Sequence, residues 1–320
     1  MYEPSQSAII GWNGTTEVFL LSTNVRASSE NWAIELIPFP SLPAEPVAGT
    51  LDIFHAFKDY IDAAIGIPMA GDVDLNRQID IIDALLVAQF YVGLKPSGFY
   101  KYAGDVNDSG AIDIVDALIL AQYYVGLNGG SWSDPSETVN VVFREQIGIH
   151  NVTTVETENA SQLISFAEQV LSQVAATDDI QWSGFEEIAA DYITRGMKYW
   201  VIDLIDVTDS TKSRDPLIYS FETDYLYFPL IVSSVNSGNT LIDVVTVSKT
   251  KLDREGIESA GFEGIPIDGY FDIVFPDLNG MCPEIASLFA VYSSPMKIAR
   301  HFYEGPLSDL SKDIITRERE

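Results

Sequence analysis

The chain has 320 residues, of which 47% are hydrophobic and 11% aromatic, so it can bury a substantial core. It carries 47 acidic against 18 basic residues, a formal net charge of −29, which argues against nucleic acid as a partner because binding phosphates requires clusters of Lys and Arg. This acidity favours divalent cations or simply keeps an exported protein soluble. The single cysteine, Cys282, excludes an intrachain disulfide and a thiolate-rich metal site.

The chain lacks an apolar run near the ~20 residues that span a bilayer. We therefore expect membrane contact only through a segment outside this sequence. We expect the protein to be extracellular or on the cell surface, with a signal peptide removed ahead of residue 1.

The first predicted elements are strands over 7–12 and 17–22, joined by Asn13-Gly14, a strong hairpin signal. The proline-rich stretch 38–43 is expected to end this pattern. An amphipathic helix follows, with Leu51, Phe54, Ile61 and Ile65 at its apolar positions. The dipeptide Ile67-Pro68 and the turn residues at 128–137 then bracket the central part of the chain.

That central part contains one internal repeat. Residues 71–94 read GDVDLNRQIDIIDALLVAQFYVGL and residues 104–127 read GDVNDSGAIDIVDALILAQYYVGL, identical at 15 of 24 positions. Two copies form a paired motif and fall short of a solenoid, which needs at least three units. We predict a domain inserted over 66–138, with its host divided into 1–65 and 139–320.

Each repeat has the oxygen spacing of a twelve-residue calcium loop, which places ligands at positions 1, 3, 5, 7, 9 and 12, the seventh through a backbone carbonyl. In the second copy Gly110 stands at position 6, where the chain must turn sharply. The predicted ligands of the two loops are Asp72, Asp74, Asn76, Gln78, Asp80 and Asp83 in the first, and Asp105, Asn107, Ser109, Ala111, Asp113 and Asp116 in the second.

The first loop departs from this pattern at one position, because Arg77 stands where Gly110 stands in the second. A residue with a side chain in a left-handed conformation costs on the order of 1 kcal/mol, and the Arg77 cation lies beside the predicted ion. The ligand set is otherwise intact. We therefore expect two Ca²⁺ ions, the first bound with altered affinity.

Each loop runs into a helix, predicted from the sequences ALLVAQFYVG and ALILAQYYVG. Asp83 and Asp116 stand in the first turns, where a carboxylate complements the helix dipole. The apolar residues are too dense for two exposed helices. The helices are expected to pack on each other with approximate two-fold symmetry and still leave apolar surface for a partner.

These loops and helices resemble a dockerin of type I, a tandem F-hand module in which each EF-hand-like loop lacks the entering helix. The resemblance implies protein–protein interaction with a cohesin, in cellulosomes or on archaeal and bacterial cell surfaces. It also implies that loop positions 10 and 11 select the partner. Those positions are Ile81 and Ile82 in the first copy and Ile114 and Val115 in the second.

The apolar character of these positions leaves two interpretations open. In one, the face binds a cohesin-like protein, in either of two orientations because the repeats are nearly interchangeable. In the other, the face packs on the host domain, and calcium is a structural staple for the insertion.

The rest of the host is expected to hold strands and helices in mixed order. Helices are predicted around 163–174 and 183–193, the second from a capping box of Ser183 and Glu186. Strands are predicted over 139–147, 152–156, 199–207, 217–221, 225–232, 241–247 and 270–275. The fold class is therefore α+β, with a mixed, mostly antiparallel sheet in the host and a small all-α insertion.

The host resembles an uncharacterised family of exported archaeal and bacterial proteins. The resemblance rests on SQSAIIGWNGTTEVFLLST, ELIPFPSLP, VVFREQIGIHNVTTVE and TDYLYFPLIVSS. It implies export more than chemistry, since no activity is established for that family.

The host shows no recognisable catalytic motif. Carboxylate pairs such as Glu186 with Glu187 and Asp203 with Asp206 are expected by chance in so acidic a chain, although a glycosidase needs such a pair. The sequence therefore favours a non-catalytic calcium-binding protein that assembles with a partner. The alternatives are a polysaccharide hydrolase recruited to a scaffold and a self-associating surface protein.

Overall fold

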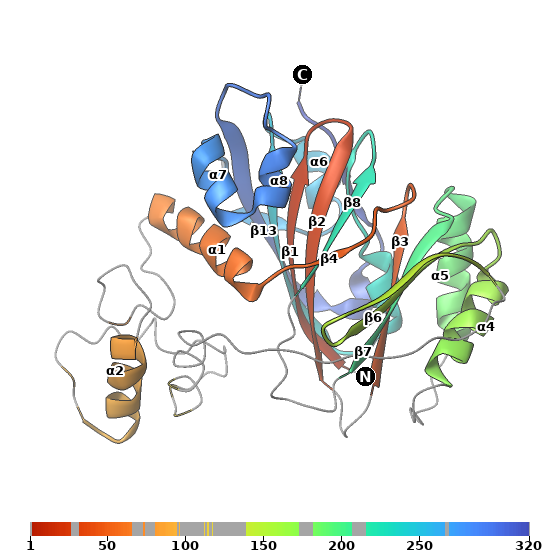
Figure 1. Cartoon of the computed structure of the whole chain (residues 1–320), viewed down its shortest axis with the longest axis horizontal. Helices are drawn as coiled ribbons and strands as arrows, with labels where there is room; N and C mark the ends of the chain where they lie inside the picture. The colour runs from red at the N-terminus through yellow and green to blue at the C-terminus, as the bar shows by residue number, and fades with distance from the viewer. Residues whose placement is uncertain are drawn as a thin grey trace. The chain divides into compact units, whose positions relative to one another are not determined.

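The computed structural model describes residues 2–26, 32–65, 73, 81–94, 96, 112, 114, 117, 139–172, 182–206, 216–265 and 269–319. The chain divides into two compact units, one formed by 1–54 with 129–320 and the other by 55–128. The larger unit holds most of the strands, and its helices and sheets are coloured along the chain in Figure 1.

The larger unit begins with the predicted hairpin. Strands β1 (Tyr2–Trp12) and β2 (Thr16–Arg26) pair antiparallel, with Trp12 opposite Glu17. Asn13 Oδ1 accepts hydrogen bonds from the backbone N–H groups of Thr15 and Thr16, at 3.0 and 2.9 Å, and Gly14 takes a φ of 100°. The turn chemistry of Asn-Gly therefore fixes the register of both strands, and this prediction is confirmed.

The hairpin lies in an eight-stranded sheet of order β11-β13-β10-β1-β2-β8-β4, with β12 also paired to β13. Strands β1 and β10 (Asn239–Ser248) pair parallel, whereas the other strand pairs in the described part of this sheet are antiparallel. The remaining members are β4 (Val47–Ala48), β8 (Leu217–Glu222), β11 (Glu263–Ile265), β12 (Phe271–Ile273) and β13 (Met296–Pro306).

A second, antiparallel sheet has the order β3-β7-β6-β5. Its strands are β3 (Trp32–Phe39), β7 (Tyr199–Asp206), β6 (His150–Glu156) and β5 (Asn140–Ile147). A short pair of β9 (Leu226–Phe228) and β14 (Ile314–Thr316) completes the strand pairing of the described residues. The predicted mixed, mostly antiparallel α+β host is thus confirmed, whereas an all-α insertion falls largely outside the described residues.

The two large sheets pack face to face. Phe39 of the second sheet has its ring centroid 5.3 Å from that of Tyr219 and 5.1 Å from that of Phe221, both in the first sheet. Residues of both sheets, including Phe19 and Val201, share one buried cluster. Strands with apolar residues at alternate positions give each sheet one apolar face, and the two sheets bury these faces against each other.

Helices cover the outer faces of this pair of sheets (Figure 1). Helices α4 (Ala160–Leu171) and α5 (Trp182–Thr194) lie on the second sheet, where Phe185 and Tyr192 meet Trp200 edge-on. Helix α8 (Pro283–Ser287) contacts β1, and a Cβ at Gly11 would lie 2.5 Å from Ile285 Cγ2, so only glycine fits there. Short helices α6 (Arg254–Glu258), α7 (Phe275–Met281), η2 (Ile231–Val235) and η3 (Leu307–Asp309) fill the connections.

Three sequence predictions are wrong in detail. Strand β3 continues through Pro38, which is tolerated because β3 is an edge strand and one side of it needs no backbone donor. Helix α5 begins at Trp182, so Ser183 lies inside it, and Glu186 instead accepts a hydrogen bond from Ser161. The strand expected over 225–232 ends at Phe228 and turns into the 3₁₀ helix η2.

In the smaller unit, the described residues include most of helix α1 (Leu51–Ile65), as predicted, and helix α2 (Ile81–Tyr91). Within the described part of the chain, no helix is long and apolar enough to cross a membrane.

Candidate functional site

The two repeats share one apolar cluster. Val73, Ala84, Val87 and Ala117 are buried in it, and Leu86, Ala88 and Ile112 pack against it. Ala84 and Ala117 are 33 residues apart, which is the spacing of the repeat, so equivalent positions of both copies meet in this cluster. The expected contact between the repeats is therefore present among the described residues.

Both predicted calcium loops are anchored in this cluster. Val73 stands between the predicted ligands Asp72 and Asp74 of the first loop and is fully buried. Ile112 stands between Ala111 and Asp113 of the second loop and is partly buried against the same residues. One apolar residue of each predicted loop thus belongs to the same cluster.

Helix α2 has the predicted aspartate in its first turn and a glycine shortly after its end. It begins at Ile81, position 10 of the first predicted loop, and Asp83, position 12, lies in its first turn. Beyond its end Gly93 takes a φ of 84°, and its N–H donates to the carbonyl of Phe90 at 3.0 Å. This left-handed glycine satisfies the last carbonyl groups, and the second repeat has Gly126 at the equivalent position.

Large apolar side chains of this unit remain exposed. Ile82 is 46% exposed and Ile114 49%, and both belong to the predicted partner-binding positions. Leu85, one helical turn after Ile82, is 51% exposed. The exposed residues Phe90, Tyr91, Val92 and Leu94 extend this apolar character beyond the end of helix α2. Such a concentration of exposed apolar surface is typical of a binding face.

Most predicted ligands lie outside the described residues. These are Asp72, Asp74, Asn76, Gln78, Asp80, Asp105, Asn107, Ser109, Ala111, Asp113 and Asp116, and Val115 of the partner positions joins them. For Asp83 and Ile81 the structure describes the helical backbone. No group of three or more His, Cys, Asp or Glu residues that could hold a metal occurs in the described part of the chain. The calcium ligands therefore stay predictions.

Three host residues of the acidic and aromatic types that a polysaccharide hydrolase uses are buried. Asp203 is 1% exposed, and its Oδ2 lies 2.5 Å from His150 Nδ1. Trp12 and Trp200 are buried in the core shared by the sheets and helices. These three residues therefore offer no open surface to a sugar chain.

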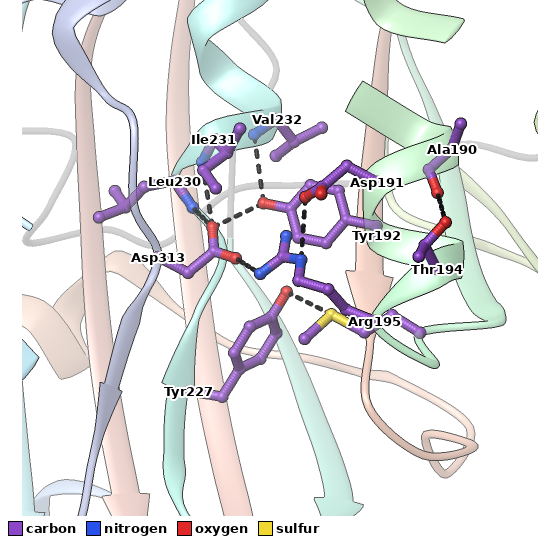
Figure 2. Close-up of polar contacts among 11 residues, drawn as sticks. Ala190, Asp191, Tyr192, Thr194, Arg195, Tyr227, Leu230, Ile231, Val232 and Asp313 are labelled. Atoms are coloured by element: carbon purple, nitrogen blue, oxygen red, sulfur yellow. Dashed lines mark hydrogen bonds and ion pairs between the residues drawn. The ribbon is translucent and has the colours of Figure 1, made fainter. Parts of the chain in front are cut away.

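A polar network that the sequence did not reveal surrounds Asp313 (Figure 2). Asp313 Oδ1 accepts hydrogen bonds from the Tyr192 hydroxyl at 2.6 Å and from the backbone N–H groups of Leu230 and Ile231 at 2.8 and 3.1 Å. Its Oδ2 accepts from Arg195 at 2.8 Å. Burial and the Asp313 charge raise the pKa of Tyr192, so its hydroxyl stays protonated and donates. The network joins α5, η2 and the C-terminal segment, and it has a structural role.

The two repeats share one apolar cluster within a larger α+β chain, and the first of them contains helix α2. The family of this part of the chain is shown by a direct match: residues 70–125 match the dockerin type I domain, so the chain carries a dockerin type I segment. The comparisons give no support to the resemblance of the host to an exported family, and a search of curated proteins finds no match.

The whole chain also has a distant similarity to solved structures of baculovirus P35. The crystal structure of P35 aligns with a TM-score of 0.45 at 8% identity, covering 100% of this chain and 97% of that one. P35 in the caspase-8/P35 complex aligns with a TM-score of 0.40 at 8% identity, covering 99% of this chain and 97% of that one. Similarity at this level carries no argument about function.

Proposed function

We propose that this protein is an exported, non-catalytic calcium-binding protein that assembles with a cohesin-like partner through residues 71–127. The observation that carries the proposal is the dockerin type I match over residues 70–125, since dockerins bind cohesins and occur in extracellular or cell-surface proteins. The apolar cluster shared by the repeats supports it, because it accounts for how two short loop-and-helix units stabilise each other.

Calcium would fold the loops of this segment. Each loop supplies six oxygen positions in the order that wraps one ion at roughly 2.3–2.6 Å. An ion held by carboxylates of both the loop and the following helix would fix the start of that helix. We propose two ions because both loops keep all six ligand positions. At a free calcium concentration about one hundred times the dissociation constant, one site adds roughly 2.7 kcal/mol to stability.

The partner face would be centred on positions 10 and 11 of the two loops. Ile82 and Ile114 expose nearly half of their surface, and Leu85 continues the apolar stripe along helix α2. We propose that these side chains recognise a partner in trans. Apolar anchors at the centre of an interface supply most of its binding energy.

Calcium binding is tested by calorimetry on the full, calcium-depleted chain. Two binding events are expected, with Asp72→Ala removing the first and Asp105→Ala removing the second. Asp277→Ala removes an exposed carboxylate of the host and should leave both events unchanged. A chain that binds no calcium would contradict the proposal.

Partner binding is tested with an isolated type I cohesin domain, in calcium and after chelation. Calcium-dependent binding is expected, and the double variant Ile82→Lys with Ile114→Lys should weaken it at least tenfold, because it places an unpaired charge in the interface in either orientation. The matched control is Val291→Lys in the host, because Val291 is 100% exposed. If two ions bind but the chain shows no calcium-dependent association of any kind, the result would favour calcium as a structural staple of the insertion. If calcium causes the chain to dimerise without binding cohesin, the result would favour self-association.

A further inference from the structure

A small pocket lies in the larger unit, apart from the dockerin segment. It has a volume of about 60 Å³ and is lined by residues of α6, of β13 and of the C-terminal segment. The residues that determine its chemistry are Lys251, Arg254, Glu258, Tyr270, His301 and Arg319.

The charge of this pocket is opposite to that of the chain. Three of the chain's 18 Lys and Arg residues line it, whereas the chain as a whole carries −29. Glu258 is the one carboxylate among the lining residues, and its Oε1 lies 2.8 Å from Arg254 Nε. The lining therefore keeps an excess of positive charge in a molecule that otherwise repels anions.

Backbone pairing brings together the two segments that carry Lys251 and Arg319. The N–H of Arg319 donates to the carbonyl of Lys251 at 2.8 Å, and the adjacent residues Leu252 and Glu318 form a β-bridge. The Tyr270 hydroxyl accepts a hydrogen bond from the N–H of Leu252 at 3.1 Å. The ring of Tyr270 thus lies beneath Lys251, whose Nζ is 5.8 Å from the ring centroid.

His301 adds a directed polar atom. It is only 5% exposed, and its Nε2 lies 3.2 Å from the Thr246 hydroxyl oxygen. Its Nδ1 has no hydrogen-bond partner among the described residues and faces Gly264, another lining residue, where a Cβ would lie 3.6 Å from it. Burial, and then the charge of Arg254, lower the pKa of His301 to about 4, so the ring is neutral. When Thr246 donates to Nε2, the proton is on Nδ1 and can be donated to a ligand.

We propose that this pocket binds a compact oxyanion, the carboxylate or phosphate group of a small molecule, between Lys251, Arg254 and Arg319 with His301 at its base. Guanidinium groups match the paired oxygens of both anions, and the volume suits such a group better than a whole ligand of ordinary size. The remainder of the molecule would lie over the adjoining open groove, where Asp253, Glu255 and Ser259 favour polar or cationic groups.

The test uses the full, calcium-loaded chain and follows its three histidines by NMR at constant ionic strength. Inorganic phosphate and acetate are titrated separately at pH 6, with chloride as the reference. We expect saturable shifts of the His301 signals, and in saturating phosphate an upward shift of its pKa. The tighter of the two probes identifies the class of anion.

Variants distinguish specific anion binding by the lining residues from general electrostatic attraction. Arg319→Gln and Lys251→Gln should each weaken binding about tenfold, as expected for loss of a charge-assisted contact. Arg317→Gln removes the same charge two residues from Arg319, outside the lining, and should not change affinity. Absence of saturable His301 shifts with both probes, or equal weakening by the Arg317 and Arg319 variants, would overturn the proposal. Thermal unfolding checks that each variant is folded.

Discussion

Ala84 and Ala117 occupy the same position in the two repeats and are buried in one apolar cluster, with exposed fractions of 5% and 6%. Both stand one residue after the last predicted ligand of their loop, Asp83 or Asp116. The small side chain at this position lets the two copies approach closely. Each of these alanines directly follows a predicted calcium loop, so both predicted loops end at the same apolar cluster.

The first prediction concerns this close contact. Ala84→Leu and Ala117→Leu should each destabilise the segment by about 1–3 kcal/mol, because added methylene groups overpack a filled core. The two losses should be similar, and the double variant should deviate from their sum because both sites belong to one cluster. Hydrogen exchange of the α2 amides in calcium measures the change. Ala63→Leu, at an exposed position of α1, is the control, and a loss there as large as at Ala84 would contradict the prediction.

The second prediction concerns position 6 of the loops, where Arg77 and Gly110 differ. Arg77→Gly should tighten the first calcium site, and Gly110→Arg should weaken the second. The expected size is about fivefold in each direction, from on the order of 1 kcal/mol of backbone strain together with the charge of the arginine. Calorimetry of the two reciprocal variants measures both affinities. If neither affinity moves, position 6 has the same backbone conformation in both loops whatever residue it holds.

The third prediction concerns Glu17, which is fully buried on β2. Its Oε2 accepts a hydrogen bond from the Tyr227 N–H at 2.8 Å, and its Oε1 has no partner within the described residues. Burial raises the pKa of Glu17 well above its usual range, although the Tyr227 N–H opposes this. The folded chain therefore holds a proton that the unfolded chain loses above its ordinary pKa of about 4.3. It follows that stability falls as the pH rises from there towards the folded pKa.

Glu17→Gln removes this dependence. The variant should be more stable than the parent at neutral pH and should show a smaller loss of stability from pH 4 to pH 8. Denaturant unfolding of the larger unit at intervals of one pH unit measures the effect. Glu222→Gln, on the neighbouring strand and exposed, should reproduce the parent curve. A Glu17→Gln curve parallel to that of the parent would show that Glu17 does not carry the pH dependence.

Sequence patterns predicted the parts of the fold that depend on local chemistry. The Asn13-Gly14 turn defined the first hairpin, and apolar spacing identified α1, α4 and most strands of the host. Strand β13 was missed because Arg300 and His301 interrupt its apolar pattern. In the structure, Arg300 Nε donates a hydrogen bond to Asp243 Oδ1 at 2.8 Å. These two residues are 57 positions apart in the sequence. A pairing between residues so far apart cannot be predicted from a short stretch of sequence.

The same distinction applies to the functional sites. The predicted calcium ligands of each loop lie within twelve consecutive residues, so their spacing alone predicts a site. The cationic pocket brings Lys251 and Tyr270 together with His301 and Arg319, and its charge becomes apparent only when these segments pair. Asp313 likewise meets Tyr192 and Arg195, which precede it by 121 and 118 residues. No repeat or motif in the sequence marks these contacts.

The last prediction concerns the Asp313 network. Asp313→Ala leaves the Tyr192 hydroxyl and two backbone N–H groups without their acceptor and removes the ion pair with Arg195, whose Nε still lies 3.0 Å from Asp191 Oδ2. The variant should lower the free energy of unfolding by about 3–5 kcal/mol. Asp313→Asn keeps an acceptor oxygen for the first three donors and should cost less, since it loses chiefly the ion pair. Asp224→Ala breaks an exposed pair with Arg317 and should change stability by less than about 0.5 kcal/mol. Denaturant unfolding of the three variants gives this order. Equal losses for Asp313→Ala and Asp224→Ala would mean that the buried carboxylate does not hold the C-terminal segment to α5, and that the β9–β14 pairing suffices.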